Sequence, residues 1–334
     1  TKMNKTLANF SEVFAALYIF LMIASITGNL VCLFGLTRKY HKRRFRDHFF
    51  ISMVICDLLR ISLTGPMEIR GLMQQQVTDE SFCIGFSFIM SLFEFTSISH
   101  LLLVVMDRYI CVCKPTLALK LYLQPTTIYK AILLSYLYGL FWSVLPLFGL
   151  GEFGFQIGEL QCGLKPKHDI ASKVYILLVL LIAYIVPVGI TIWCFFHVWK
   201  RTKTNNNGVV TVSDESQDQK DLRKYFSSDR KQFQLILALI LTFIFTWFVY
   251  DLTMFEEIYI AQEANAYAEI VTTFIGQSSA LITPLAILAF YTDLQKTFMK
   301  FLGKKRAENT SVTKSRASTR VVPIAGSVET PSAT

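Results

Sequence analysis

Residues 83–115, CIGFSFIMSLFEFTSISHLLLVVMDRYICVCKP, are the stretch of sequence that decides the fold. The part before Cys113 is mostly apolar and carries only three charged residues, Glu94, Asp107 and Arg108. A helix needs about 20 predominantly apolar residues to cross a bilayer, and this stretch is longer than that. Core helices of soluble proteins rarely run so far with so few charges. We therefore interpret the stretch as a membrane-spanning helix.

Six other stretches of the chain have the same apolar character. Of the 334 residues, 53% are hydrophobic and 17% are charged, whereas a soluble domain carries about 25% charged residues. The expected spans cover residues 13–37, 49–73, 83–112, 131–151, 174–199, 233–256 and 268–291. The sequence therefore predicts an all-α membrane protein, a seven-transmembrane-helix bundle that forms one domain of residues 13–302.

The charges of the loops predict the orientation of the bundle. The first loop, residues 38–48, has six basic residues and one acidic residue. The last loop taken together with the adjoining helix ends, residues 251–269, has five acidic residues and no basic one. Because basic loops stay in the cytoplasm, we expect a multi-pass protein of the plasma membrane with its N-terminus outside and its C-terminus inside. The net charge of +9 then faces anionic lipid headgroups and cytoplasmic partners rather than nucleic acid.

The two ends of the chain differ in character from the spans. Residues 1–12 are expected to be extracellular, and they contain glycosylation sequons at Asn4 and Asn9. After the last span, residues 293–302 place apolar side chains on one helical face with lysines between them, which predicts a short amphipathic helix on the inner membrane surface. Residues 303–334 are rich in Ser and Thr and are expected to be a disordered cytoplasmic tail.

Short polar and aromatic motifs lie at matching depths on the seven spans. In chain order they are Asn29, Asp57, Asp107-Arg108-Tyr109, Trp247 and Thr283-Pro284. This set, in this order, resembles the rhodopsin-like (class A) G-protein-coupled receptors, and the resemblance covers nearly the whole chain. It implies a receptor, not an enzyme, that signals to a heterotrimeric G protein. It also implies that a receptor kinase and arrestin act on the Ser/Thr tail.

Within that family the chain resembles the opsins. The resemblance is carried by residues 108–115 (RYICVCKP), 141–149 (FWSVLPLFG) and 276–280 (GQSSA). In opsins a lysine in the last of these stretches forms the Schiff base with retinal, but this chain has Gln277 there. A Schiff base requires a nucleophilic primary amine, and the nitrogen of an amide is delocalised. No lysine lies within the seven expected spans.

Two further positions agree with the loss of covalent retinal. The position of the opsin counterion on the third span is Phe86, and the second opsin carboxylate position, before Cys162, is Gln156. We therefore expect a relative of the lysine-lacking opsins called placopsins, with no covalent cofactor. Retinal held non-covalently and a diffusible small-molecule ligand remain as alternatives.

The resemblance also implies where a small molecule of unknown identity would bind. The expected pocket residues are Phe86, Met90, Glu94, Trp247, Tyr250, Gln277 and Arg60. Arg60 and Gln277 are expected to face each other. We hypothesise that Arg60 and Glu94 form a buried ion pair, because an unpaired charge in the membrane costs several kcal/mol. The alternative is that these two charges have a structural role only and contact no ligand. Separately, the acidic outer loops favour a cationic ligand.

A second polar group is expected around Asp57. In the family, Asp57, Ser97 and Trp247 would surround a sodium pocket, and Asn29 would brace Asp57. This chain has Thr283 where Asn is usual, which favours a water-filled polar cluster over a bound sodium ion near Asp57. The cysteines show no metal-ligand spacing, so we expect no other metal site.

The inner ends of the helices are expected to control coupling. The resemblance implies that Asp107 holds Arg108 in the resting state. Asp229 would be a second partner of Arg108 from the sixth helix, or else a solvated loop charge. Departures from the family pattern, which predict weak coupling, are Val249 in place of Pro, and Phe195 and Ile287 in place of Tyr.

Cys83 and Cys162 are the two outward-facing cysteines, and the resemblance implies a disulfide between them that ties the second outer loop to the third helix.

A competing interpretation of the whole chain is a non-signalling membrane protein that binds a retinoid or lipid. The missing Pro and Tyr residues favour that interpretation, whereas the intact Asp107-Arg108-Tyr109 disfavours it.

Overall fold

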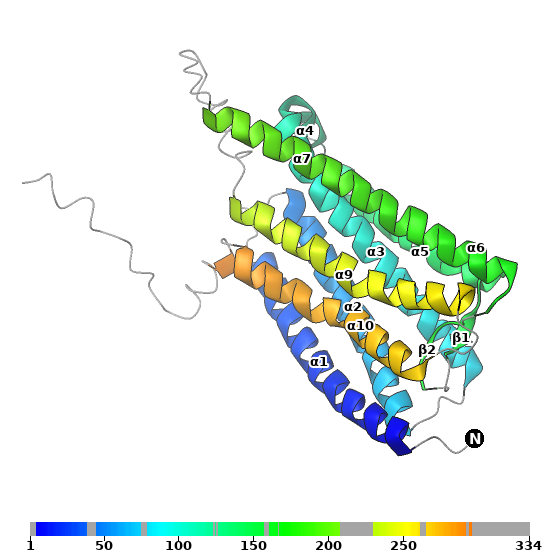
Figure 1. The fold of residues 1–334 in the computed structure, drawn as a ribbon. Coiled ribbons are helices and arrows are strands. Elements are labelled where there is room, and N and C mark those ends of the chain that lie inside the picture. Colours follow the sequence, from blue (N-terminus) through cyan, green and yellow to red (C-terminus); the bar gives the residue numbers. More distant parts are fainter. Residues whose placement is uncertain are drawn as a thin grey trace, which may run out of the picture. The chain divides into compact units, whose positions relative to one another are not determined.

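A computed structural model shows the chain as a bundle of long helices with a short hairpin at one end (Figure 1). The structure describes residues 5–38, 45–74, 79–122, 124, 126–156, 160–165, 167–207, 230–260, 265–291 and 294–295. Asn4, Asp229, the tail of residues 303–334 and nearly all of the expected amphipathic helix lie outside this set. The described elements belong to one compact unit, Thr1–Gln295.

Seven helices among the described residues are long and apolar enough to cross a membrane. They are α1 (Lys5–Thr37), α2 (Phe45–Gln74), α3 (Glu80–Cys113), α5 (Thr126–Val144) with its 3₁₀ continuation η2 (Leu145–Phe148), the continuous run of α6 (Ile170–Leu178), η3 (Val179–Ile185) and α7 (Val186–Asn207), then α9 (Arg230–Tyr259) and α10 (Ala266–Phe290). The predicted seven-helix bundle is therefore confirmed.

Several helices extend beyond the apolar spans. α1 begins at Lys5 rather than at residue 13, and α9 continues to Tyr259 rather than ending at residue 256. Hydropathy marks only the part of a helix that lies in hydrocarbon, whereas the backbone hydrogen bonds continue into the polar interface. A short helix that we did not expect, α4 (Pro115–Tyr122), starts with proline, whose missing N–H is unneeded at that position.

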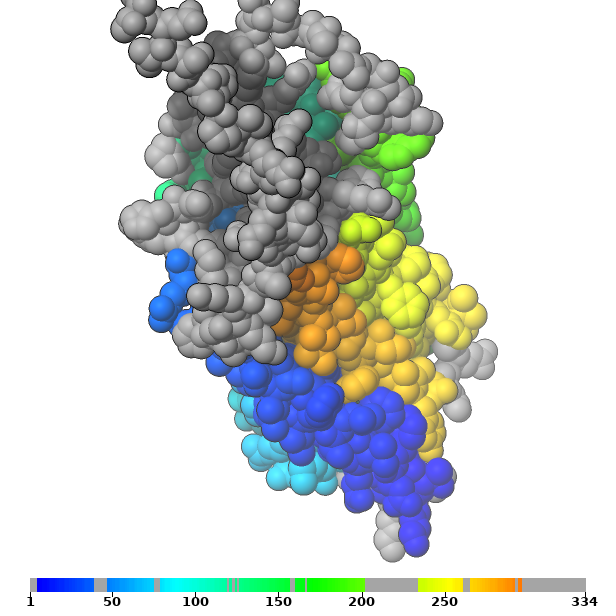
Figure 2. Space-filling view, turned by 90° about the vertical axis from the view of Figure 1, so that its left-hand side faces the viewer, coloured from blue at the N-terminus to red at the C-terminus, as the bar shows by residue number. Residues whose placement is uncertain are grey.

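α3 is the central helix of the bundle. It contacts α2, α5, α7 and α9, and both strands of the hairpin pack against it. α5 comes closest at Gly139, where a Cβ atom would lie 2.6 Å from the carbonyl oxygen of Leu92 and 3.0 Å from the amide nitrogen of Thr96. A small residue is what permits two membrane helices to approach this closely. Away from α3, α1 and α10 lie side by side, as Figure 2 shows.

The outer surface of the bundle is apolar. Phe20 on α1, Leu134 and Phe141 on α5, and Phe245 on α9 are each more than half exposed. Such side chains would be unfavourable in water, but they suit contact with lipid, which offers no polar partner.

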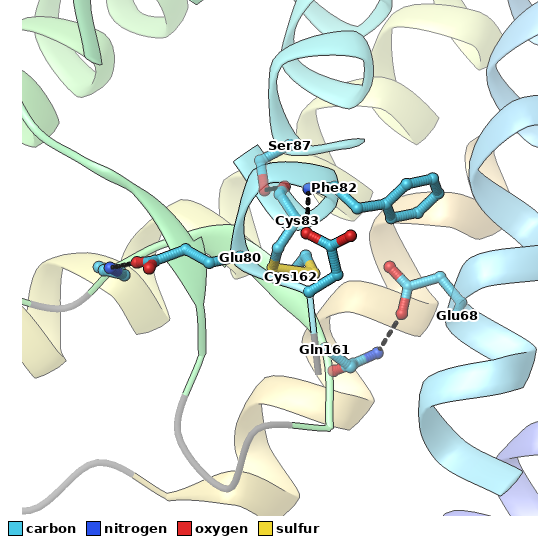
Figure 3. The surroundings of a disulfide bond; sticks show 9 residues. Glu68, Glu80, Phe82, Cys83, Ser87, Gln161 and Cys162 are labelled. Atoms are coloured by element: carbon cyan, nitrogen blue, oxygen red, sulfur yellow. Dashed lines mark hydrogen bonds and ion pairs between the residues drawn. A yellow bond between two sulfur atoms is a disulfide. The ribbon is translucent and has the colours of Figure 1, made fainter. Parts of the chain in front are cut away.

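The hairpin is fastened to the start of α3. β1 (Phe153–Phe155) and β2 (Cys162–Leu164) pair antiparallel, with Phe155 opposite Cys162. Cys162 forms a disulfide with Cys83, and the two Cα atoms are 5.3 Å apart (Figure 3). The disulfide implied by the sequence is thus confirmed, and it holds the loop between α5 and α6 against the end of the bundle.

Two lysines and one carboxylate of the hairpin region form an ion network with Glu80, the first residue of α3. Lys165 Nζ lies 2.9 Å from Glu80 Oε1 and 2.7 Å from Glu152 Oε1, and Lys167 also pairs with Glu152. Hydrogen bonds from Lys165 and Lys167 hold the pKa of Glu152 below its usual value, and the hydrogen bonds to Glu152 and Glu80 raise the pKa of Lys165. Because these side chains are partly exposed, each pair contributes little to stability.

Candidate functional site

Arg60 is the centre of a buried polar group that joins α2 to α10. Only 1% of this residue is exposed. Its Nη1 donates to Gln277 Oε1 at 2.9 Å, and its Nη2 donates to Ser279 Oγ at 2.8 Å and to Asp57 Oδ1 at 3.3 Å. The expectation that Arg60 and Gln277 face each other is confirmed. Asp57 stands three residues before Arg60, so both side chains leave the same face of α2.

Gln277 is fully buried, and its amide is engaged on both sides. The oxygen accepts from Arg60, and Nε2 lies 3.4 Å from both Thr64 Oγ1 on α2 and Met90 Sδ on α3. The residue therefore links three helices. Sequence reasoning missed Thr64, although its place four residues after Arg60 on the same helix was a usable signal.

Trp247 packs directly against this polar group. Arg60 Cζ lies 5.2 Å from the centroid of the Trp247 ring, within the range of a cation–π interaction. Trp247 Nε1 donates to Ser279 Oγ at 3.1 Å. The Tyr250 ring meets it edge-on at 6.2 Å. Ser279 thus accepts from both Arg60 and Trp247, a role that its position in the GQSSA stretch did not reveal.

The expected ion pair between Arg60 and Glu94 is not formed, and this prediction was wrong. Among the described residues, the ion pair of Arg60 is with Asp57, and Glu94 Oε1 instead accepts a 2.5 Å hydrogen bond from the hydroxyl of Tyr184. Asp57 lies one turn from Arg60 on the same helix, so these two side chains can pair whatever the rotation of the neighbouring helices. The partner of Glu94, Tyr184, was not anticipated.

Tyr184 lies in an irregular part of its helix. η3 (Val179–Ile185) is π-helical, and the N–H of Val186 donates to the carbonyl of Leu181, five residues earlier. An extra residue in a turn changes which side chains face the core beyond it, and such bulges are frequent at functional sites. This is why a regular helical period did not point to Tyr184.

A small cavity of about 10 Å³, enough for the centre of about one water molecule, lies below Trp247. The side chains that line it include Asp57, Arg60, Glu94, Ser97, Trp247, Ser279 and Thr283. The polar residues predicted around Asp57 are therefore brought together. Asn29 is the exception, because its Nδ2 donates to the carbonyls of Ser25 and Ala280 at 2.9 and 2.8 Å and so ties α1 to α10 rather than bracing Asp57.

The hairpin covers one end of the expected ligand pocket. Gln156 Nε2 donates to the Tyr250 hydroxyl at 3.0 Å, and Gln161 Nε2 donates to Glu68 Oε2 at 2.8 Å (Figure 3). Phe86 is buried on α3 beneath the disulfide end. The loop therefore contributes side chains to this end of the pocket, among them Gln156, which the sequence had marked only as an opsin carboxylate position.

The end of the bundle opposite the hairpin holds the residues expected to control coupling. Arg108 Nε lies 3.8 Å from Asp107 Oδ2, so the expected pair is formed. Arg108 also lines a second small cavity with Val105, Cys194, Phe195, Val198 and Ile236. The Tyr109 ring packs on Trp193, with centroids 4.8 Å apart.

Pro284 is buried in α10, where it packs against α1. A Cβ on Gly28 of α1 would lie 3.1 Å from Cγ of Pro284.

Comparison with known proteins agrees with this geometry. Residues 28–287 match the family described as 7 transmembrane receptor (rhodopsin family). Because the match covers most of the chain, the protein belongs to the rhodopsin-like family of seven-transmembrane receptors, which are not enzymes. Its relatives within that class A family are opsins.

The individual similarities are distant but long. Melanopsin-A of Danio rerio is 21% identical over 286 residues, which cover 84% of this chain and 48% of the relative. The red-sensitive opsin of Xenopus laevis is 21% identical over 319 residues, 94% of this chain and 84% of the relative. The crystal structure of squid rhodopsin has the same fold, with a TM-score of 0.78 at 16% identity over 91% of this chain and 87% of that one. The chain spans about half the length of the melanopsins it matches.

Proposed function

We propose that this chain is an opsin-like receptor that passes a signal to a heterotrimeric G protein and carries no covalently attached retinal. Membership of the rhodopsin-like receptor family supports the signalling part. The observation that carries the retinal part is the surrounding of Gln277.

Covalent retinal does not fit the residues around Gln277. The resemblance places Gln277 where opsins have the lysine that binds retinal. Here Arg60 Nη1 lies 2.9 Å from the side-chain oxygen. An ammonium group in the same place would meet a guanidinium at hydrogen-bond distance, and two buried cations repel strongly. The position beside Arg60 therefore suits the neutral side-chain amide of Gln277 and not the ammonium group of a lysine.

The ligand of such a receptor would be a diffusible small molecule. Gln277, Met90, Tyr250 and Trp247 are buried within one connected set of contacts, and Glu94 lies beside them. A molecule that binds against these side chains would change how Trp247 packs on Arg60 and Ser279. It would thereby shift the populations of two helix arrangements.

Retinal held non-covalently is the second candidate. Phe86, Met90, Trp247 and Tyr250 are apolar or aromatic and buried, and this lining suits a conjugated hydrocarbon chain. A retinoid or lipid carrier without signalling would use the same lining.

The inner end of the bundle supports coupling to a partner protein. Asp107 pairs with Arg108 at 3.8 Å, and this pair must be broken before Arg108 can meet a cytoplasmic partner. Asp229 would be a second partner of Arg108. A receptor kinase and arrestin would act on the Ser/Thr tail of residues 303–334.

The N-terminus is proposed to lie outside the plasma membrane and the C-terminus inside. The Cys83–Cys162 disulfide supports this, because disulfides form on the oxidising, outer side of the cell, and the hairpin is at that end of the bundle. Asn9 is exposed on α1 near the same end, accessible for glycosylation, and Asn4 carries the second sequon.

A spectrum tests the retinal part. The full chain is expressed, 11-cis-retinal is added in the dark, and the purified protein is measured before and after acid denaturation. We expect no retinal band that survives denaturation. A surviving covalent adduct would contradict the proposal, and a band lost on denaturation would favour the second candidate.

A nucleotide-exchange assay tests the signalling part. Membranes containing the chain are compared with membranes containing the Arg108→Ala variant, using a panel of purified heterotrimeric G proteins and labelled GTP. We expect basal exchange that Arg108→Ala lowers. No exchange with any G protein, with equal amounts of both proteins present, would favour the non-signalling carrier.

A further inference from the structure

The carboxylate of Asp57 already has a cation beside it. Arg60 Nη2 lies 3.3 Å from Asp57 Oδ1, and both side chains are buried, with 2% and 4% of their surface exposed. Arginine keeps its charge in proteins under all ordinary conditions. The negative charge that would attract an ion from solution to this cavity is therefore balanced from within the chain.

Two other side chains around the cavity, Ser279 and Thr283, are also engaged, whereas the buried Ser97 Oγ has no hydrogen-bond partner among the described residues. Ser279 Oγ accepts from Arg60 and from Trp247, and it donates to the carbonyl of Gly276 at 2.8 Å. The Thr283 hydroxyl donates to the carbonyl of Ser279 at 2.9 Å. The remaining cavity, about 10 Å³, has room for the centre of about one water molecule, and Arg60 is part of its lining, so a cation there would lie beside a guanidinium. The residues of this site do not fit the sodium ion that the family resemblance suggested.

We infer that Arg60 is the resident cation of this site, that the protein does not take up sodium at Asp57, and that removal of the Arg60 side chain uncovers a latent site for a small monovalent cation. Without Arg60, the Asp57 carboxylate and the hydroxyls of Ser97, Ser279 and Thr283 would surround an enlarged polar cavity. Oxygen atoms of this kind are what a hard cation binds. An uncompensated carboxylate in the membrane interior would favour such binding.

A tethered cation also differs from a diffusible one in what it connects. The guanidinium that balances Asp57 contacts Gln277 on one side and the Trp247 ring on another. An ion can leave the site, whereas Arg60 can only exchange partners. Asp57 and the expected ligand pocket are thus joined by one side chain, and the charge balance at Asp57 is independent of external salt.

Thermal unfolding in detergent tests the inference without any ligand or G protein. The full-length purified chain is heated in NaCl from zero to about 150 mM, with choline chloride replacing sodium so that ionic strength is constant. We expect the Tm of the unmodified protein to be the same throughout. We expect the Tm of Arg60→Ala to rise with sodium, by roughly 2–4 °C, and the double variant Arg60→Ala/Asp57→Asn to show no rise.

Arg70→Ala is the matched control, because Arg70 is on the same helix but exposed. It should behave like the unmodified protein. A sodium-specific rise in Tm of the unmodified protein would overturn the inference, and so would a folded Arg60→Ala that ignores sodium. If Arg60→Ala cannot be purified, Arg60→Gln replaces it, and the measurement on the unmodified protein can still contradict the inference on its own.

Discussion

Arg60 on α2 and Gln277 on α10 meet in the centre of the bundle through a 2.9 Å hydrogen bond from Nη1 to Oε1. Both residues are almost fully excluded from solvent, at 1% and 0% exposure. Since Arg60 cannot lose its proton, position 277 has to offer it an acceptor. The two positions are therefore constrained together.

Charge variants at position 277 should destabilise the protein to very different extents. Gln277→Lys removes the acceptor and places a second cation beside Arg60, and should lower the free energy of unfolding by about 3–5 kcal/mol. Gln277→Glu has nearly the same shape and keeps an acceptor, so it should cost much less. Thermal unfolding in detergent measures both. Equal losses for the two variants would mean that shape, and not charge, decides at this position.

The close approach of α5 to α3 predicts a severe effect from one methyl group. Gly139→Ala would place a Cβ 2.6 Å from the Leu92 carbonyl oxygen, and it should destabilise the protein by about 1–3 kcal/mol. Gly85→Ala is the control, since a Cβ on Gly85 would meet nothing within 4 Å. That variant should be neutral or slightly stabilising, because alanine favours a helix over glycine. Expression level and Tm of the two variants report the difference.

The 2.5 Å contact between Tyr184 and Glu94 predicts energetic coupling between the two side chains. Tyr184→Phe, Glu94→Gln and the double variant form a cycle in which the interaction energy should be about 1–3 kcal/mol. Glu94→Ala alone should reduce surface expression or basal signalling. Tyr259→Phe, whose hydroxyl instead contacts the carbonyl of Lys173, should be additive with Glu94→Gln. Additivity at Tyr184 as well would exclude a significant bond.

The ion network of the hairpin predicts a weak pH dependence. The folded pKa of Glu152 is lowered from 4.5, so its contribution is present above that value and is lost as pH falls through the lowered pKa. The folded pKa of Lys165 is raised from 10.5, so its contribution is present below that value and is lost as pH rises through the raised pKa.

Hydrogen-exchange protection of the Lys165 N–H, which donates to the Glu152 carbonyl at 2.8 Å, measures this effect. After correction for the intrinsic pH dependence of exchange, protection should be lower at acid pH than at neutral pH. Glu152→Gln should remove most of that difference. An unchanged difference in this variant would assign the pH dependence to other groups.

The sequence predicted the framework better than the contacts within it. The seven spans, the Cys83–Cys162 disulfide and the facing of Arg60 and Gln277 followed from apolar run lengths and from family motifs at matching depths. The Arg60–Glu94 pair was wrong because residue types give charge but not the rotation of one helix against another. Tyr184 was missed because it lies within a π-helical segment, where the regular helical period does not hold.

The disulfide closes a loop of backbone that contains nearly all of α3 together with α4 and α5, since its two cysteines are separated by 79 positions. A protease that cuts the chain once within that loop leaves a single covalent molecule, whereas one cut between α7 and α9 yields two. On electrophoresis, a nick between α3 and α5 would therefore be invisible until a reducing agent is added, and two fragments would then separate.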